Sequence, residues 1–137
     1  MEWRIVNAAD YGMPQRRRRT YIVGYRKDSA VARRVEQMES WVKYDGVLAK
    51  AFPFEQKQSS LSQFCIAGDI QHVSACFNKG KKTSPFRSAG MIADRKVVSM
   101  DAVPLYDGTM YTLGGILVDE EFVPEEFFIS DDDLQKW

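Results

Sequence analysis

The chain has 137 residues, of which 45% are hydrophobic and 28% are charged. This composition excludes a disordered chain, and no apolar run approaches the ~18 residues that a membrane-spanning helix needs. The net charge is zero, yet residues 1–100 carry 18 Lys and Arg against 9 Asp and Glu, whereas residues 101–137 carry 1 against 10. A basic body with an acidic tail indicates a polyanionic partner, the alternative being that the tail only screens the body.

The first predicted elements are two strands, residues 3–8 and 20–25, joined by a loop. Both segments are short and rich in β-branched and aromatic residues, and Gly12 and Pro14 mark the loop between them. The continuous apolar content of residues 21–23 is typical of a strand that is covered on both faces.

The next segments are predicted to be helical and then extended. Ser29 is a candidate N-cap for a helix over residues 30–42, because apolar side chains recur there on one helical face. Residues 59–63 predict a short helix, and residues 64–66 and 70–77 favour strands.

The last third of the chain predicts a hairpin and an acidic segment with a solvated turn at residues 119–121. Residues 86–93 and 96–103 flank a turn at 94–95, and residues 112–118 predict one or two helical turns. Ser130 followed by three aspartates is a helix start signal with barely one turn after it. Because the first strand also begins at once, we expect the chain to be a fragment of a larger protein.

The clearest functional signal is the string NAADYGMPQRRRRTYIVG, residues 7–24. An arginine cluster beside a Gly-Pro loop predicts phosphate contact, because guanidinium groups fork onto phosphate oxygens. On charge alone, a solvated basic loop is an equal alternative. The whole string closely resembles motif VIII of the DNA (cytosine-5) methyltransferases, which reads roughly N-A-x-D-Y-G-x-P-Q-x-R-x-R followed by a strand. The resemblance implies that the target recognition domain of that family begins after it.

The resemblance also implies a role for each matched residue. Arg19 would reach toward O2 of a flipped cytosine in the catalytic pocket, where its permanent charge makes it a fixed electrostatic partner. Arg17 would contact the DNA backbone or brace the pocket, and Gln15 would hold the loop beside the active site. Arg16 and Arg18 occupy variable positions, and alternation along a strand directs them to the other side, toward phosphate or solvent.

A second basic cluster follows in the region expected to recognise DNA. Lys79, Lys81, Lys82 and Arg87 are candidates for phosphate contact, with a solvated loop as the alternative. His72 has no partner ligands in the sequence, so we expect a structural role for it and no metal site.

The sequence lacks other parts of the family's catalytic apparatus. The catalytic cysteine of the family lies in a Pro-Cys-Gln context, whereas Cys65 and Cys76 have other neighbours and are predicted to be small core residues. Neither a Glu-Asn-Val tripeptide nor a glycine-rich F-x-G-x-G turn for S-adenosylmethionine is present. We therefore expect the parent enzyme to use S-adenosylmethionine, and this chain alone to be inactive and to bind no cofactor.

The predicted fold class is α+β, with an N-terminal β-hairpin left from an α/β methyltransferase sheet and then a mostly β domain with short helices. Residues 1–27 would end the catalytic domain, and residues 28–137 would form a target recognition domain that is truncated at its C-terminal end. We expect a bacterial cytoplasmic protein of a restriction-modification system. Its partners would be double-stranded DNA, the rest of the catalytic domain and a second copy bound through the exposed hairpin. The alternatives are a non-catalytic nucleic-acid-binding module and a protein-interaction domain with an acidic docking tail.

Overall fold

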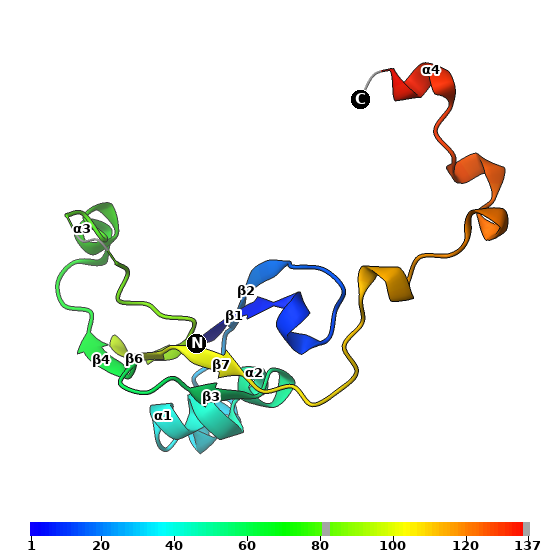
Figure 1. Ribbon diagram of the computed structural model, residues 1–137. Coiled ribbons are helices and arrows are strands. Elements are labelled where there is room, and N and C mark those ends of the chain that lie inside the picture. The colour runs from blue at the N-terminus through cyan, green and yellow to red at the C-terminus, as the bar shows by residue number, and fades with distance from the viewer. Residues whose placement is uncertain (81–82, 136–137) are drawn as a thin grey trace.

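The computed structural model describes residues 1–80 and 83–135. At its centre lies a five-stranded antiparallel sheet with the strand order β2-β1-β5-β6-β4 (Figure 1). Its strands are β1 (Glu2–Asn7), β2 (Arg18–Val23), β4 (Ser62–Cys65), β5 (Ala89–Ala93) and β6 (Lys96–Met100). A second, two-stranded sheet pairs β3 (Phe54–Gln56) with β7 (Ala102–Pro104).

The helices are all short. The α-helices are α1 (Met38–Ser40), α2 (Val47–Ala51), α3 (Ile70–Ala75) and α4 (Asp131–Leu134). A π-helical turn, η3 (Trp41–Asp45), connects α1 to α2. The 3-10 turns are η1 (Ala8–Tyr11), η2 (Ala32–Arg34), η4 (Leu113–Gly115), η5 (Glu120–Phe122) and η6 (Glu125–Phe127). None of the helices in the described part of the chain combines the length and apolar character needed to span a bilayer. The predicted α+β class is confirmed.

Both predicted hairpins form. In the first, β1 pairs antiparallel with β2, so that Glu2 lies opposite Val23 and Asn7 lies opposite Arg18. In the second, β5 and β6 are joined at Asp94 and Arg95, which both have positive φ angles, of 46° and 67°. Two consecutive positive φ angles are typical of the tight turns whose twist matches that of the flanking strands.

The prediction that residues 21–23 are covered on both faces is wrong. β2 is the outermost strand of the sheet, and the side chain of Ile22 is 62% exposed. Residues 21 and 23 face the same side as the buried Glu2 and Arg4, because they pair with them in the hairpin. The opposite face of β2 therefore presents an apolar side chain to solvent.

The long helix predicted over residues 30–42 is also wrong. Ser29 does cap a turn, since its Oγ accepts a hydrogen bond from Ala32 N at 3.1 Å, but this turn, η2, ends at Arg34, and helical geometry resumes only at α1. Val35 leaves helical geometry at φ −77° and ψ 86° and packs against the core. Its partial burial, with the full burial of Trp41 and Val42, outweighs the local helical pattern, because intrinsic propensity is the weaker effect.

Two further short segments adopt a secondary structure different from the predicted one. Residues 59–63 do not form a helix: Ser59 has φ 56°, and β4 begins at Ser62 and pairs with β6. The strand predicted over residues 64–66 is partly confirmed by β4. Residues 70–77 do not form a strand, because α3 begins there, where the Asp69 carboxylate accepts a hydrogen bond from His72 N at 3.0 Å.

The prediction that Cys65 and Cys76 are core residues is wrong, because both are exposed. Cys65 ends β4, where exposure alternates along the strand and the neighbouring Phe64 takes the more buried position. Cys76 follows α3, a short helix without buried residues. In the acidic tail, η4 lies within the predicted turns, and Ser130 caps α4 as predicted, with its Oγ accepting from Asp133 N at 3.3 Å.

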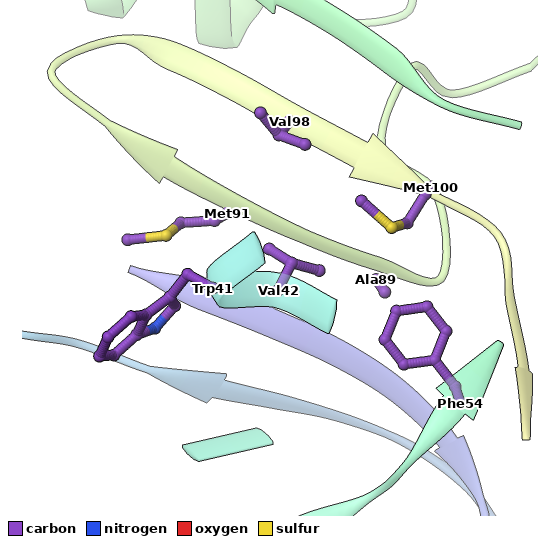
Figure 2. Close-up of a cluster of buried hydrophobic side chains, with 7 residues drawn as sticks. All are labelled: Trp41, Val42, Phe54, Ala89, Met91, Val98 and Met100. Carbon is purple, nitrogen blue, oxygen red and sulfur yellow. The ribbon is translucent and has the colours of Figure 1, made fainter. Parts of the chain in front are cut away.

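The main hydrophobic core lies on one face of the central sheet (Figure 2). Its buried side chains come from η3, β3, β5 and β6 and are those of Trp41, Val42, Phe54, Ala89, Met91, Val98 and Met100. On the other face, Trp3 and Phe64 each contact the ring of Phe86, with centroid distances of 5.5 and 5.6 Å. Gly90 is required under Trp3, because a Cβ there would lie 2.2 Å from the indole. The inner strands are thus covered on both faces.

The central sheet joins residues from both sides of the proposed domain boundary. β1 pairs with β5, placing Glu2 opposite Met91. The segments on either side of the boundary between residues 27 and 28 therefore share one sheet, and the boundary separates proposed functional roles. Beyond β7 the chain first passes beside the loop between β1 and β2, where Tyr111 N donates to Gly12 O, and then runs away from the sheet toward its C-terminal end (Figure 1).

Candidate functional site

The loop between β1 and β2 is an ordered structure built by the residues of the recognised string. Gly12 ends η1 at φ 87°, and Met13 N donates to Ala8 O at 3.1 Å. Asn7 donates from Nδ2 to the Asp10 carboxylate at 3.0 Å. Ala8 N donates to Arg17 O at 3.0 Å and closes the hairpin. We refer to residues 8–17 as the motif loop.

The four arginines stand exposed at the end of this hairpin. Arg19 donates from Nη1 to Arg18 O at 2.8 Å, and none of the four forms an ion pair with another residue in the described ranges. Gln15 is also exposed on the motif loop. Adjacent cations without a carboxylate beside them produce a positive potential that attracts a polyanion.

The register of the hairpin separates Arg18 from Arg19. Arg19 pairs with Val6 and so shares the face of Arg4 and Tyr21, whereas Arg18 pairs with Asn7 and points to the other face. This is the alternation predicted for these two residues. Arg16 and Arg17 precede β2, so strand alternation does not fix their directions.

An aromatic cluster that the sequence did not predict adjoins the motif loop. The ring of Tyr11 lies 5.3 Å from that of Phe52 and 6.3 Å from that of Tyr106, and Tyr21 lies 5.1 Å from Phe52. Burial raises the pKa of the Tyr11 phenol, an effect that Arg4 opposes. The phenol is therefore neutral near pH 7 and donates a hydrogen bond to Pro53 O at 3.1 Å. These residues come from three distant segments with no common period, so no sequence pattern could have identified the cluster.

Two charged side chains of β1 are buried beneath the hairpin, and no pattern in the sequence predicts their burial. Arg4 is 1% exposed, donates to Phe52 O at 2.7 Å and to Val42 O at 3.0 Å, and lies 4.0 Å above the ring of Phe54. Burial lowers the pKa of its guanidinium, and nearby Tyr11 and Glu2 oppose that shift.

Glu2 is likewise 1% exposed. Its Oε1 accepts hydrogen bonds from Tyr25 Oη at 2.6 Å and from Leu48 N at 2.9 Å, which ties β1 to α2. Burial and the hydrogen bond to Glu2 raise the pKa of Tyr25. These contacts of Glu2 and Arg4 hold the hairpin on the core. They support the exposed arginines at residues 16–19 but do not include any of them.

The second predicted basic cluster is only partly described. Lys79 is exposed beyond α3, and Lys81 and Lys82 lie outside the described residues. Arg87 forms an ion pair with Asp101 at 2.9 Å. The segment that carries Lys79 lies near the segment that carries Arg87, as the 5.6 Å between the ring centroids of Phe77 and Phe86 shows. Part of the positive charge expected here is thus already paired.

A cavity of about 990 Å³ lies between α3 and the sheet. Its lining is largely apolar and includes Phe64, Ile70 and Phe86. His72 Nε2 lies 3.8 Å from Cys76 Sγ at this site. Within residues 1–80 and 83–135, no group of three or more His, Cys, Asp or Glu residues could hold a metal ion.

Fold and site together describe an α+β protein with a polyanion-attracting arginine loop, and comparison with known proteins defines its family. The family of C-5 cytosine-specific DNA methylases matches residues 1–114. The chain is 31% identical over 141 aligned residues to the Type II methyltransferase M.Sau3AI of Staphylococcus aureus, an alignment that covers 100% of this chain and 32% of that protein. This chain belongs to the C-5 cytosine-specific DNA methylase family, which confirms the resemblance predicted from the sequence.

A second relative matches over a shorter stretch. The Type II methyltransferase M.MthTI of Methanothermobacter thermautotrophicus is 57% identical over 28 residues, which are 20% of this chain and 8% of that protein. No solved structure matches this chain. The chain spans about a third of the length of M.Sau3AI. Type II methyltransferases are typical of restriction-modification systems.

The methyltransferase family uses S-adenosylmethionine, but the described residues do not fit this cofactor. Acidic side chains commonly hold the ribose hydroxyls of such ligands, yet the large cavity has no carboxylate in its lining. The turn that leads from β4 into α3 holds one glycine, Gly68, rather than a glycine-rich loop. A smaller cavity, of about 360 Å³, has Glu36 and Asp45 in its lining, but the segment that forms it, residues 34–50, holds one glycine, Gly46, rather than a glycine-rich loop. We therefore assign no step of the reaction to the cofactor on this chain.

Proposed function

We propose that this chain supplies the motif VIII arginines and the target-recognition surface of a DNA (cytosine-5) methyltransferase. That enzyme would transfer a methyl group from S-adenosylmethionine to C5 of cytosine within a specific DNA sequence. The observation that carries the proposal is the arginine cluster, which is exposed on an ordered hairpin and has no carboxylate partner among the described residues. Such a cluster suits contacts with phosphates, which release counterions from DNA, and with base edges.

The proposed roles differ between the two faces of the hairpin. Arg19, on the face of Tyr21, would stabilise negative charge on a flipped cytosine, since a guanidinium keeps its proton. Arg17 would contact the backbone or brace the pocket, and Gln15 would hold the loop. Arg16 and Arg18 would contact phosphates.

The second basic cluster would add phosphate contacts from the recognition region. Its proposed members are Lys79, Lys81, Lys82 and Arg87. Arg87 would have to exchange its ion pair with Asp101 for a phosphate, so we expect it to contribute less than Lys79. Residues 28–137 would thereby form the recognition domain, and residues 1–27 would end the catalytic domain.

The outer edge of β2 is the proposed contact with the catalytic part of the enzyme. No described strand pairs with that edge, and Ile22 beside it is 62% exposed. An unpaired apolar edge is a template for another strand, and the hairpin would thus belong to the methyltransferase sheet. The sequence holds no Pro-Cys-Gln, so the nucleophile would come from that catalytic part, and this chain alone would be inactive. A second copy that pairs with the same edge would give a homodimer.

Binding to a DNA duplex at several salt concentrations tests the DNA surface. Log affinity should fall linearly with log salt concentration, and the double substitution of Arg16→Ala and Arg18→Ala should reduce the slope by about 1.8, or about 0.9 for each phosphate contact. Arg33→Ala with Arg34→Ala is the matched control, because it removes the same charge from exposed positions on η2. Duplex binding that is indifferent to salt would overturn the proposal.

A complementation assay tests the enzymatic role. We expect cytosine methylation of host DNA, read by bisulfite sequencing, when this chain is co-expressed with the remaining part of M.Sau3AI. Neither part alone should give methylation, and Arg19→Ala should abolish it. If the duplex binds as expected but methylation never appears, the chain is instead a non-catalytic DNA-binding module.

A further inference from the structure

The chain returns to the motif loop after β7. Leu105 N donates to Pro53 O at 2.9 Å, and Tyr111 N donates to Gly12 O at 2.9 Å. Between these two anchors, Tyr106 Oη donates to Thr109 O at 3.1 Å and closes a turn. We refer to residues 105–111 as the clamp.

The clamp approaches the motif loop so closely that only glycine fits at position 12. A Cβ on Gly12 would lie 2.5 Å from Tyr106 Oη and 2.6 Å from Thr109 O. The φ angle of Gly12, 87°, independently favours glycine. The recognised string and the clamp are therefore fitted to each other at this point.

A continuous series of aromatic contacts leads from the clamp to the arginines. The ring of Tyr106 contacts that of Tyr11 at 6.3 Å, Tyr11 contacts Phe52 at 5.3 Å, and Phe52 contacts Tyr21 at 5.1 Å. Tyr21 shares one face of β2 with Arg19. Edge-to-face and tilted ring contacts of this kind each contribute modest stabilisation and fix relative orientation.

We propose that Tyr106 is a positioning residue, through which the clamp holds the motif loop in the conformation that presents its arginines to DNA. The inference rests on the proposed function for the identity of the ligand, but the closure of the loop by the clamp is a property of the chain alone. The clamp lies in the proposed recognition domain and the loop in the proposed catalytic part. The contact therefore couples the two, and any ligand that orders one of them favours the closed state of the other.

The first test measures opening of the motif loop in the full chain without DNA. Trypsin cleaves after arginine, so cleavage at residues 16–19 reports how often the loop opens. We expect Tyr106→Ala to speed this cleavage about tenfold and to abolish protection of the Tyr111 amide from hydrogen exchange. Tyr106→Phe, which keeps the ring, should restore most of the protection. Tyr44→Ala is the matched control, because Tyr44 lies on η3 and is 69% exposed.

The second test measures duplex binding by the same variants. Tyr106→Ala should weaken binding and lower the salt slope, whereas Tyr106→Phe and Tyr44→Ala should resemble the unchanged chain. If Tyr106→Ala also lowers the melting temperature, Tyr106→Leu, which keeps apolar volume, replaces it in both tests.

The outcomes distinguish the two proposals. Unchanged cleavage and unchanged amide protection in Tyr106→Ala and Tyr106→Leu would overturn the role of Tyr106, even if the chain binds DNA. Faster cleavage together with no salt-dependent binding by the unchanged chain would support the clamp and overturn the proposed function. Faster cleavage with weaker binding and a smaller slope would support both.

Discussion

Two adjacent regions of the hairpin place arginine in opposite environments. On β1, Arg4 is buried, bonded to two backbone carbonyls and stacked over Phe54. On the motif loop and β2, residues 16–19 expose four arginines that have no carboxylate partner within the described ranges.

The comparison teaches that the groups around an arginine, rather than the residue type, decide its role. A structural arginine is buried and hydrogen-bonded inside the protein, whereas a candidate functional one faces solvent. The guanidinium of Arg4 satisfies the carbonyl of Val42 in a buried hydrogen bond and that of Phe52 in a partly buried one, and its removal takes both donors away. The exposed guanidiniums form no ion pair in the described protein, and the one hydrogen bond among them runs from Arg19 to the carbonyl of Arg18. Their charges are therefore available to an external anion.

The largest expected effect comes from Arg4→Ala. It leaves Phe52 O and Val42 O without their donor and opens a cavity beside Phe54, so we expect the free energy of unfolding to fall by about 3–5 kcal/mol. Urea denaturation measures the change. Arg4→Lys should lose less, because an ammonium group keeps the charge but not the planar fork. A loss below about 1 kcal/mol for Arg4→Ala would remove the distinction between the two arginine environments.

A smaller effect is expected from Tyr25→Phe, which removes the hydrogen bond to the buried Glu2. The loss at neutral pH should be about 1–2 kcal/mol, as for a bond to a charged acceptor. Because the pKa of Tyr25 is raised in the folded state, its stabilisation is complete below the unfolded pKa of about 10 and is lost as the pH rises through the folded pKa.

Denaturation at several alkaline pH values therefore checks the role of Tyr25. The unchanged chain should lose more stability above pH ~10 than Tyr25→Phe does, with a remaining loss from Tyr11, whose pKa is also raised. Parallel pH profiles for the two proteins would contradict the assigned network around Glu2.

The smallest expected effect is that of Arg17→Ala and Arg19→Ala on folding. Each should change the free energy of unfolding by less than about 0.5 kcal/mol, because exposed side chains contribute little, and the hydrogen bond of Arg19 to Arg18 O is itself exposed. The same urea series measures both. A loss comparable to that of Arg4→Ala would show that these arginines are structural, and it would remove the basis of the proposed function.

Local signals in the sequence were sufficient to predict those features whose geometry is set by a single turn or helix cap. The turn at Asp94 and Arg95, the loop at Gly12 and the cap at Ser130 all formed where predicted. In each case, the residues that determine the geometry lie within a few positions of one another. The recognised string likewise identified the family, because its order and spacing are contained in eighteen contiguous residues.

Signals that depend on distant packing misled the sequence interpretation. Residues 30–42 have a helical apolar pattern, yet Val35, Trp41 and Val42 are drawn into the core from separate turns. Free cysteines are usually buried, yet Cys65 and Cys76 are exposed and line the open cavity between α3 and the sheet. Short segments follow the contacts available to them, since their intrinsic preferences amount to only a fraction of the burial energy.

The sequence by itself determined the hairpins, the arginine loop and membership of the methylase family, because contiguous residues encode each of these. Only the tertiary structure decided that Arg4 and Glu2 are buried, that Tyr106 meets Gly12, and that β1 lies between β2 and β5. These features join segments that are tens of residues apart. Their physical basis is the shared burial of apolar surface and the pairing of most buried polar groups, and neither can be evaluated from a single segment of the chain.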